Sequence, residues 1–159
     1  MTLAMRTERV VRLSGEKIDG SCCSCLGTQL ARVLEFLDET LGSVVWHVAD
    51  VDAHQVLPDA LKTRSDFRLR RVGDTAELRE LAGTVEQFLS GVFLAVPAQT
   101  SSPRLPNAIG TEDEPFGEIG DAIVEIRAFD TTALEVYARA TVRIESLARA
   151  FLVAIESSD

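Results

Sequence analysis

The sequence predicts an α+β fold in which a single mixed or antiparallel sheet packs against an N-terminal and a C-terminal helix. Two long segments, residues 28–41 and 141–156, carry apolar residues at spacings of three and four, which is the helical period. Shorter segments rich in β-branched and aromatic residues lie between them. The whole chain, residues 1–159, suits one domain, because two halves would each be too small to bury a stable core.

The first elements are predicted from residue composition and from the glycines that end strands and helices. Residues 9–13 (RVVRL) predict a strand, and the glycine-containing, polar residues 14–27 predict a loop. The helix over residues 28–41 presents one apolar face. It should end at Gly42, since glycine accepts the left-handed backbone conformation that closes many helices. We expect residues 1–8, ahead of the first strand, to be flexible.

A second strand and a short helix are expected next. Residues 43–51 (SVVWHVADV) are rich in β-branched and aromatic side chains, which is typical of a strand. Asp52 precedes Gln55 by three positions, a spacing that fits a helix cap with a returning side chain. The sequence therefore predicts a short helix over residues 53–62.

A third strand and another short helix are expected after that. Residues 67–72 (FRLRRV) alternate in part, as a strand with one solvated face would. Asp74 and Glu77 have the spacing of a capping box, which opens a helix through Leu81. Gly83 should close it.

The middle of the chain predicts a buried strand followed by a long loop. Residues 85–96 end in a nearly continuous apolar run, which suits a central strand buried on both faces. Residues 97–121 contain four of the five prolines and several acidic residues, so they predict a long acidic loop. Loops of this length in compact domains tend to be functional or disordered.

The C-terminal third predicts a β-hairpin and then the final helix. Residues 122–129 and 133–139 alternate as two strands about a short turn. If the last residue of the first strand pairs with the first of the second, Arg127 lies opposite Glu135. Cross-strand opposite charges support that register.

Charge and hydropathy exclude several classes of function. The formal net charge is −9, which argues against a nucleic-acid partner, because phosphate binding needs clustered Lys and Arg. The longest apolar stretch, residues 88–98, is too short to span a membrane, and no signal-peptide pattern opens the chain. We therefore expect a cytoplasmic protein, and the preference for alanine and for arginine over lysine suggests a bacterial source.

The acidic part of the long loop is the leading candidate for a partner-binding surface. It contains no basic residue, and an aromatic side chain lies within it, as in many interface anchors. The alternative is a solvated loop that only keeps the protein soluble. A basic cluster could pair with it in the same molecule or in a second copy, so a homodimer stays open. The predicted partner-binding residues are Glu112, Asp113, Glu114, Phe116, Glu118 and Asp121, and the basic cluster is Arg64, Arg68, Arg70 and Arg71.

Two further groups could carry metal or redox chemistry. Cys22, Cys23 and Cys25 include a C-x-x-C spacing, but no second ligand pair completes a zinc site, so inert thiols are the simpler interpretation. Asp50, Asp52 and His54 could bind a divalent metal if they faced one way. The simpler interpretation is that Asp52 caps a helix and Asp50 lies on the surface. The candidate metal ligands are thus Cys22, Cys25, Asp50, Asp52 and His54.

The sequence contains no motif of the large enzyme classes that can be recognised from sequence. His47 has no recognisable nucleophile partner, and the chain contains no P-loop, no G-x-G-x-x-G and no G-x-S-x-G. We therefore predict no catalytic residue and no cofactor.

The stretch GDAIVEIRAFDTTALEVYARATVRIESLARAF resembles the end of small bacterial families of uncharacterised proteins. The chain is also similar in style to bacterial immunity proteins, which are small, acidic, cytosolic and α+β. This resemblance implies a non-enzymatic acidic interaction domain that binds a basic protein. The alternative is a small enzyme or a ligand- or metal-binding protein that uses Asp50, Asp52 and His54.

Overall fold

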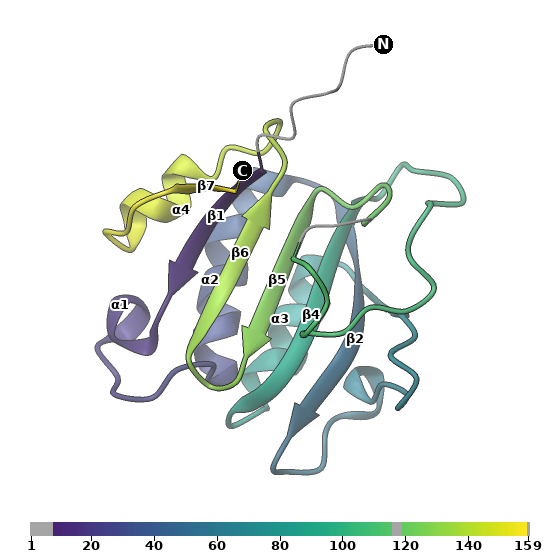
Figure 1. Cartoon of the computed structure of the whole chain (residues 1–159), viewed down its shortest axis with the longest axis horizontal. Coiled ribbons are helices and arrows are strands. Elements are labelled where there is room, and N and C mark those ends of the chain that lie inside the picture. The colour runs from purple at the N-terminus through teal and green to yellow at the C-terminus, as the bar shows by residue number, and fades with distance from the viewer. Residues whose placement is uncertain (1–7, 116–118, 159) are drawn as a thin grey trace.

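The computed structural model describes residues 8–115 and 119–158, which form one seven-stranded antiparallel sheet with helices (Figure 1). The α+β class is therefore confirmed, and the sheet is antiparallel throughout. The strand order is β3-β2-β4-β5-β6-β1-β7. In chain order the elements are β1 (Glu8–Leu13), α1 (Gly15–Asp19), α2 (Gly27–Leu41), β2 (Val44–Ala53), the 3₁₀ turn η1 (Asp59–Leu61), β3 (Arg70–Gly73), α3 (Thr75–Gly83), β4 (Phe88–Pro97), β5 (Val124–Phe129), β6 (Ala133–Ala138), α4 (Glu145–Ala150) and β7 (Glu156–Ser158).

One face of the sheet lies against the helices. Figure 1 shows α2 and α3 running behind the strands. The apolar stripe of α2, including Leu30, Leu34 and Leu37, joins Leu78 of α3 and Leu147 of α4 in one buried cluster with the inward side chains of the strands. This burial follows from the helical period of the sequence, because a stripe at that period can face only one way.

The opposite face of the sheet is covered by chain without helices. Residues 98–123, here called the covering loop, connect β4 to β5, and the described part of this loop crosses in front of these strands (Figure 1). Ile109 and Ile119 of this loop join Val92 and Leu94 of β4 in a second buried cluster. Strand β4 is therefore buried on both faces, as its apolar run predicts.

Several local predictions are confirmed. The strands predicted over residues 9–13, 43–51 and 85–96 and the helix over 28–41 all form, with bounds within a few residues. The Asp74–Glu77 capping box opens α3, with Glu77 N donating to Asp74 Oδ1 at 2.8 Å.

Three predictions are wrong in extent. Residues 14–27 contain the short helix α1, which ends where Gly20 adopts a φ of 77°. The strand predicted over 67–72 is β3, which covers only Arg70–Gly73. The helix predicted over 141–156 is α4, which covers only Glu145–Ala150. Beyond it Leu152 has a φ of 54°, and the chain turns back to pair β7 with β1.

The helix predicted over residues 53–62 does not form. Strand β2 instead continues to Ala53, which pairs with Phe88 of β4, and only η1 follows. Asp52 is therefore no helix cap: its Oδ1 accepts from the adjacent Ala53 N at 2.9 Å. Pairing with β4 gives the backbone of residues 52 and 53 hydrogen-bond partners, and this stabilises the strand more than a helix cap at Asp52 would stabilise a short helix.

Candidate functional site

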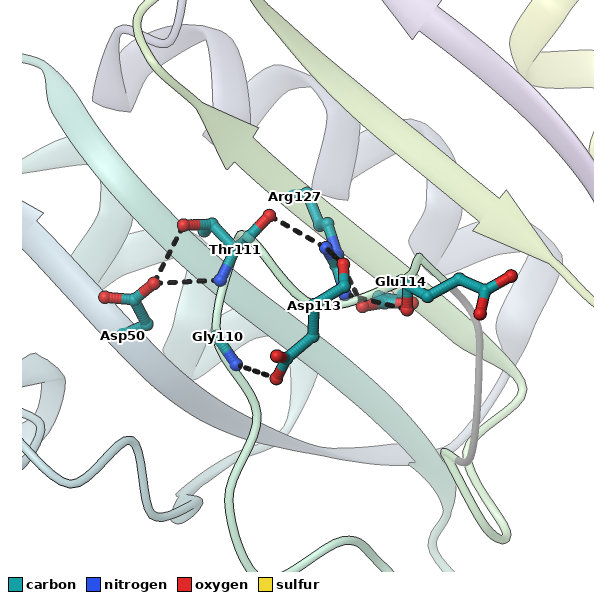
Figure 2. A network of polar contacts seen from close by, with 7 residues as sticks. Asp50, Gly110, Thr111, Asp113, Glu114 and Arg127 are labelled. Carbon is teal, nitrogen blue, oxygen red and sulfur yellow. Dashed lines mark hydrogen bonds and ion pairs between the residues drawn. The ribbon is translucent and has the colours of Figure 1, made fainter.

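Strand β2 is interrupted by a bulge that aims Asp50 at the covering loop. Ala49 pairs with Val92 and Asp52 with Ser90, so β2 contains one residue more than β4 over this step. Asp50 lies in the bulge with a φ of 52°. Bulges commonly redirect a side chain in this way. The Asp50 Oδ2 atom accepts from both Thr111 N at 2.9 Å and Thr111 Oγ1 at 2.8 Å (Figure 2).

A buried ion pair lies under the covering loop. Arg127 of β5 is 1% exposed, and its Nε donates to Glu125 Oε1 at 2.7 Å; Glu125 is fully buried. The two residues are two positions apart on one strand, so their side chains lie on the same face. A charge this deeply buried has to be paired and fully hydrogen-bonded to be tolerated.

The remaining donors of Arg127 bind the backbone of the covering loop. Its Nη1 donates to the carbonyl oxygens of Thr111 at 2.9 Å and Asp113 at 2.5 Å, and its Nη2 to that of Glu114 at 3.4 Å. Figure 2 shows the guanidinium facing these three carbonyls. The guanidinium therefore fixes the path of residues 110–114, here called the acidic turn.

The covering loop is also attached to the rest of the protein at positions outside the acidic turn. Ile109 N donates to Phe67 O at 2.9 Å, and Arg68 and Ala108 form an antiparallel bridge. Arg104 N donates to Asp121 Oδ2 at 2.7 Å. The described part of the loop is thus a second layer of structure bound to the sheet.

The three acidic residues of the acidic turn are exposed to solvent. Glu112, Asp113 and Glu114 are all exposed, as the docking prediction requires. The Asp113 Oδ2 atom accepts from Gly110 N at 2.8 Å, which closes the turn. Within the described residues, no hydrogen bond or ion pair involves the carboxylates of Glu112 and Glu114.

The other predicted docking residues differ from these three. Asp121 is engaged inside the loop, because its carboxylate binds the backbone and side chain of Arg104. Phe116 and Glu118 lie outside the described residues, as do residues 1–7 of the predicted flexible segment. The structure therefore leaves Glu112, Asp113 and Glu114 as the described acidic candidates.

Phe67 is a candidate that the sequence did not single out. Its side chain is 45% exposed and lies against Gly110, at the start of the acidic turn. Its φ is 62°, in the left-handed region, which is costly for a bulky residue. The signal in the sequence was only an aromatic residue in a charged segment, and no spacing links it to residue 110.

Among the described residues, the basic cluster forms no ion pair with the acidic side chains of the covering loop. Arg64 and Arg68 both form ion pairs with Asp66, at 3.3 Å each. Arg70 donates to the carbonyl oxygen of Lys62. The cluster lies beside the covering loop through the backbone bridge at Arg68, so the intramolecular charge pairing we considered is replaced by backbone hydrogen bonds.

The three cysteines are divided between core and surface. Cys25 is fully buried, its Sγ donates to Ala133 O at 3.2 Å, and burial raises its pKa to about 11. Its sulfur has no contact with solvent, so it is not available to a metal ion or a substrate that arrives from solvent. Cys22 and Cys23 are exposed. The C-x-x-C pair of Cys22 and Cys25 is therefore not assembled.

The Asp50, Asp52 and His54 group is not assembled either. Asp50 is bound to Thr111, Asp52 to its neighbouring backbone, and His54 is exposed beside Gln55 and Glu86. Across residues 8–115 and 119–158, no three His, Cys, Asp or Glu side chains are gathered so that they could hold a metal ion.

His47 gives the fold a pH dependence. It lies opposite Arg71 of β3, and burial, together with the nearby Arg71 charge, lowers its pKa below 6.5. At pH values between the folded and the unfolded pKa of His47, the unfolded chain binds more protons than the folded chain. The contribution of His47 to stability is therefore complete above about pH 6.5, and it is lost as the pH falls from there through the lower folded pKa. We expect His47→Gln to reduce the difference between urea midpoints measured at about pH 7.5 and about pH 5. An unchanged difference would contradict this assignment.

Comparisons with known proteins add no relative: no family model matches the chain, and neither a curated protein nor a solved structure matches it. Among the described residues, no helix has both the length and the apolar character needed to cross a membrane. The functional assignment therefore depends on the geometry of the residues themselves.

Proposed function

We propose that this chain is a non-enzymatic interaction domain whose acidic turn docks onto a basic surface of a partner protein. The most specific version is an immunity-type role, in which the partner is a bacterial toxin and the chain acts in the cytoplasm. The supporting observation is that the backbone of the acidic turn is held from beneath by Arg127 while the carboxylates of Glu112 and Glu114 face solvent.

This arrangement favours binding in two ways. A turn that is already fixed loses little conformational freedom when a partner docks, so less of the interaction energy is spent on ordering it. Exposed charges of one sign on an acidic protein also steer a basic partner toward them, which raises the association rate.

Phe67 supplies the apolar contact that charges alone lack. It is exposed and lies against Gly110, so an exposed aromatic side chain lies at the start of the acidic turn. Interfaces commonly combine an aromatic anchor with charged residues at the rim. We therefore place Phe67 within the docking surface, together with Glu112, Asp113 and Glu114.

Charge reversal at the acidic turn tests the proposal. We expect Glu112→Lys with Glu114→Lys to lower the association rate with the partner by about 10-fold or more at low salt, because steering depends on these charges. The pair leaves Asp113 and its bond to Gly110 intact. The partner would be captured from bacterial lysate with the chain as bait, and its association then measured by biolayer interferometry at low and high salt.

The matched control changes the same net charge elsewhere. Glu35 and Glu39 are exposed on α2, which packs against the other face of the sheet, so Glu35→Lys with Glu39→Lys should leave most of the rate intact. If this control slows association as much as the turn variant, or if salt has no effect on the wild-type rate, the docking surface is assigned wrongly. For the immunity-type version, the captured protein must inhibit bacterial growth and the chain must relieve that inhibition.

A further inference from the structure

Two neighbouring thiols face the same side of a surface turn. The Sγ atoms of Cys22 and Cys23 lie 3.9 Å apart, and both side chains are exposed. Consecutive residues of an extended chain point to opposite sides, so the turn before α2 is what brings these two together. This pair is distinct from the C-x-x-C spacing, whose second cysteine is buried.

The turn that presents the thiols is fixed by a buried amide. Gln29 of α2 is fully buried, and its Nε2 donates to Cys23 O at 2.8 Å and to Asp19 Oδ1 at 3.1 Å. The same Asp19 oxygen accepts from Ser21 N at 3.0 Å. On the other side, Gly15 lies so close to the carbonyl oxygen of Cys23 that a Cβ there would be 1.8 Å from it. The backbone that carries the two thiols is therefore fixed by buried contacts.

We propose that Cys22 and Cys23 form a two-thiolate site for a soft monovalent cation of the Cu(I) type. Thiolates select soft ions such as Cu(I) and Zn²⁺. Two sulfur atoms bound to one ion at about 2.3 Å lie up to about 4.6 Å apart when the S–Cu–S angle is straight, so thiols 3.9 Å apart need only a small outward rotation of exposed side chains to bind one Cu(I) ion. A structural zinc site needs four ligands, and among the described residues no third His, Cys, Asp or Glu joins this pair in a metal-holding group.

The surroundings favour a cation over an anion. Cys22 lines a surface cavity together with Glu16 and three serines, and no basic side chain lines it among the described residues. Binding would form two Cu–S bonds and release the two thiol protons to solvent. Copper and sulfur keep their oxidation states, so the step needs no oxidant or reductant.

Competition for Cu(I) under anaerobic conditions tests the site. The full chain, reduced beforehand, would compete with bicinchoninate for Cu(I), and the loss of the coloured bicinchoninate complex reports binding. We expect one Cu(I) per chain for the wild type. Cys22→Ser and Cys23→Ser should each weaken binding by more than about 100-fold, beyond the roughly 10–100-fold that changes behind the ligands cause.

Cys25→Ser is the matched control, because the hydroxyl can keep the bond to Ala133 O while removing the third sulfur. We expect it to bind Cu(I) like the wild type, with an unchanged circular dichroism spectrum. Equal loss in Cys25→Ser and Cys22→Ser would overturn the proposal in favour of the C-x-x-C pair. A wild-type chain that competes no better than Cys22→Ser with Cys23→Ser would overturn the site altogether.

Discussion

Replacing Arg127 with methionine should lower the free energy of unfolding by about 3–5 kcal/mol, because it leaves Glu125 as a buried charge without its guanidinium partner. Three backbone carbonyls of the acidic turn lose their donor as well. In a chain of this size the loss corresponds to roughly 10 °C in Tm. Urea denaturation gives the free energy. The substitution should increase the rate of amide hydrogen exchange more in residues 107–115 than in β4, because the covering loop loses its central attachment.

The control is the same substitution at another arginine of the sheet. Arg12 of β1 forms ion pairs with Glu135 and Glu156, but its side chain is 53% exposed. Exposed pairs contribute at most about 1 kcal/mol, so Arg12→Met should be mild. Adding Glu125→Gln to Arg127→Met should recover part of the loss by removing the buried charge. If Arg127→Met is as mild as Arg12→Met, the guanidinium does not hold the loop.

The hairpin illustrates what the sequence could and could not predict. Its register is confirmed, with Phe129 opposite Ala133 and Arg127 opposite Glu135. The partners of the charges are different: Arg127 binds Glu125 on its own strand, and Glu135 binds Arg12 of β1. The register depends on the alternation of apolar and polar side chains within the hairpin itself, residues 122–139. The pairing of charges depends on which distant segments lie above and beside its strands.

The covering loop was the main element that sequence reasoning could not place. Its prolines and its lack of periodicity correctly predicted a loop, but gave no sign of where it lies. One signal was present: a strand buried on both faces needs a second layer, and the helical stripes can cover only one face of the sheet. Ile109 and Ile119 were the available apolar residues for that layer. These observations indicate that the loop covers the second face of the sheet, but they do not show that Arg127 is buried beneath it.

Only part of the candidate site could be predicted from the sequence. Exposure of Glu112, Asp113 and Glu114 follows from local composition, since acidic residues without basic neighbours stay in solvent. The bulge that turns Asp50 toward Thr111 does not, because it arises from the pairing of β2 with β4, about 40 residues further along the chain. Helical spacing also failed at the C-terminus, where pairing of β7 with β1 replaces the end of the predicted helix.

Two Gly→Ala substitutions near the contact between α2 and α3 should have opposite effects on stability. Gly27 opens α2, and a Cβ there would lie 1.9 Å from the carbonyl oxygen of Val85 and 2.1 Å from that of Ala82. Both obstacles are backbone, so the helices must move apart, and we expect Gly27→Ala to lower the free energy of unfolding by about 1–3 kcal/mol or more. Urea midpoints measure the change.

Gly83 is the matched position, because it is the last residue of α3, is exposed and has no atom within 4 Å of a Cβ placed there. Gly83→Ala should raise stability by about 0.4–1 kcal/mol, since alanine restricts the unfolded chain without strain in the helix. Opposite signs at these two positions are expected because α2 begins against the backbone of residues 82–85, whereas no described atom lies near a Cβ at Gly83. A Gly27→Ala substitution that stabilises the chain as Gly83→Ala does would contradict the contact between the start of α2 and the backbone of residues 82–85.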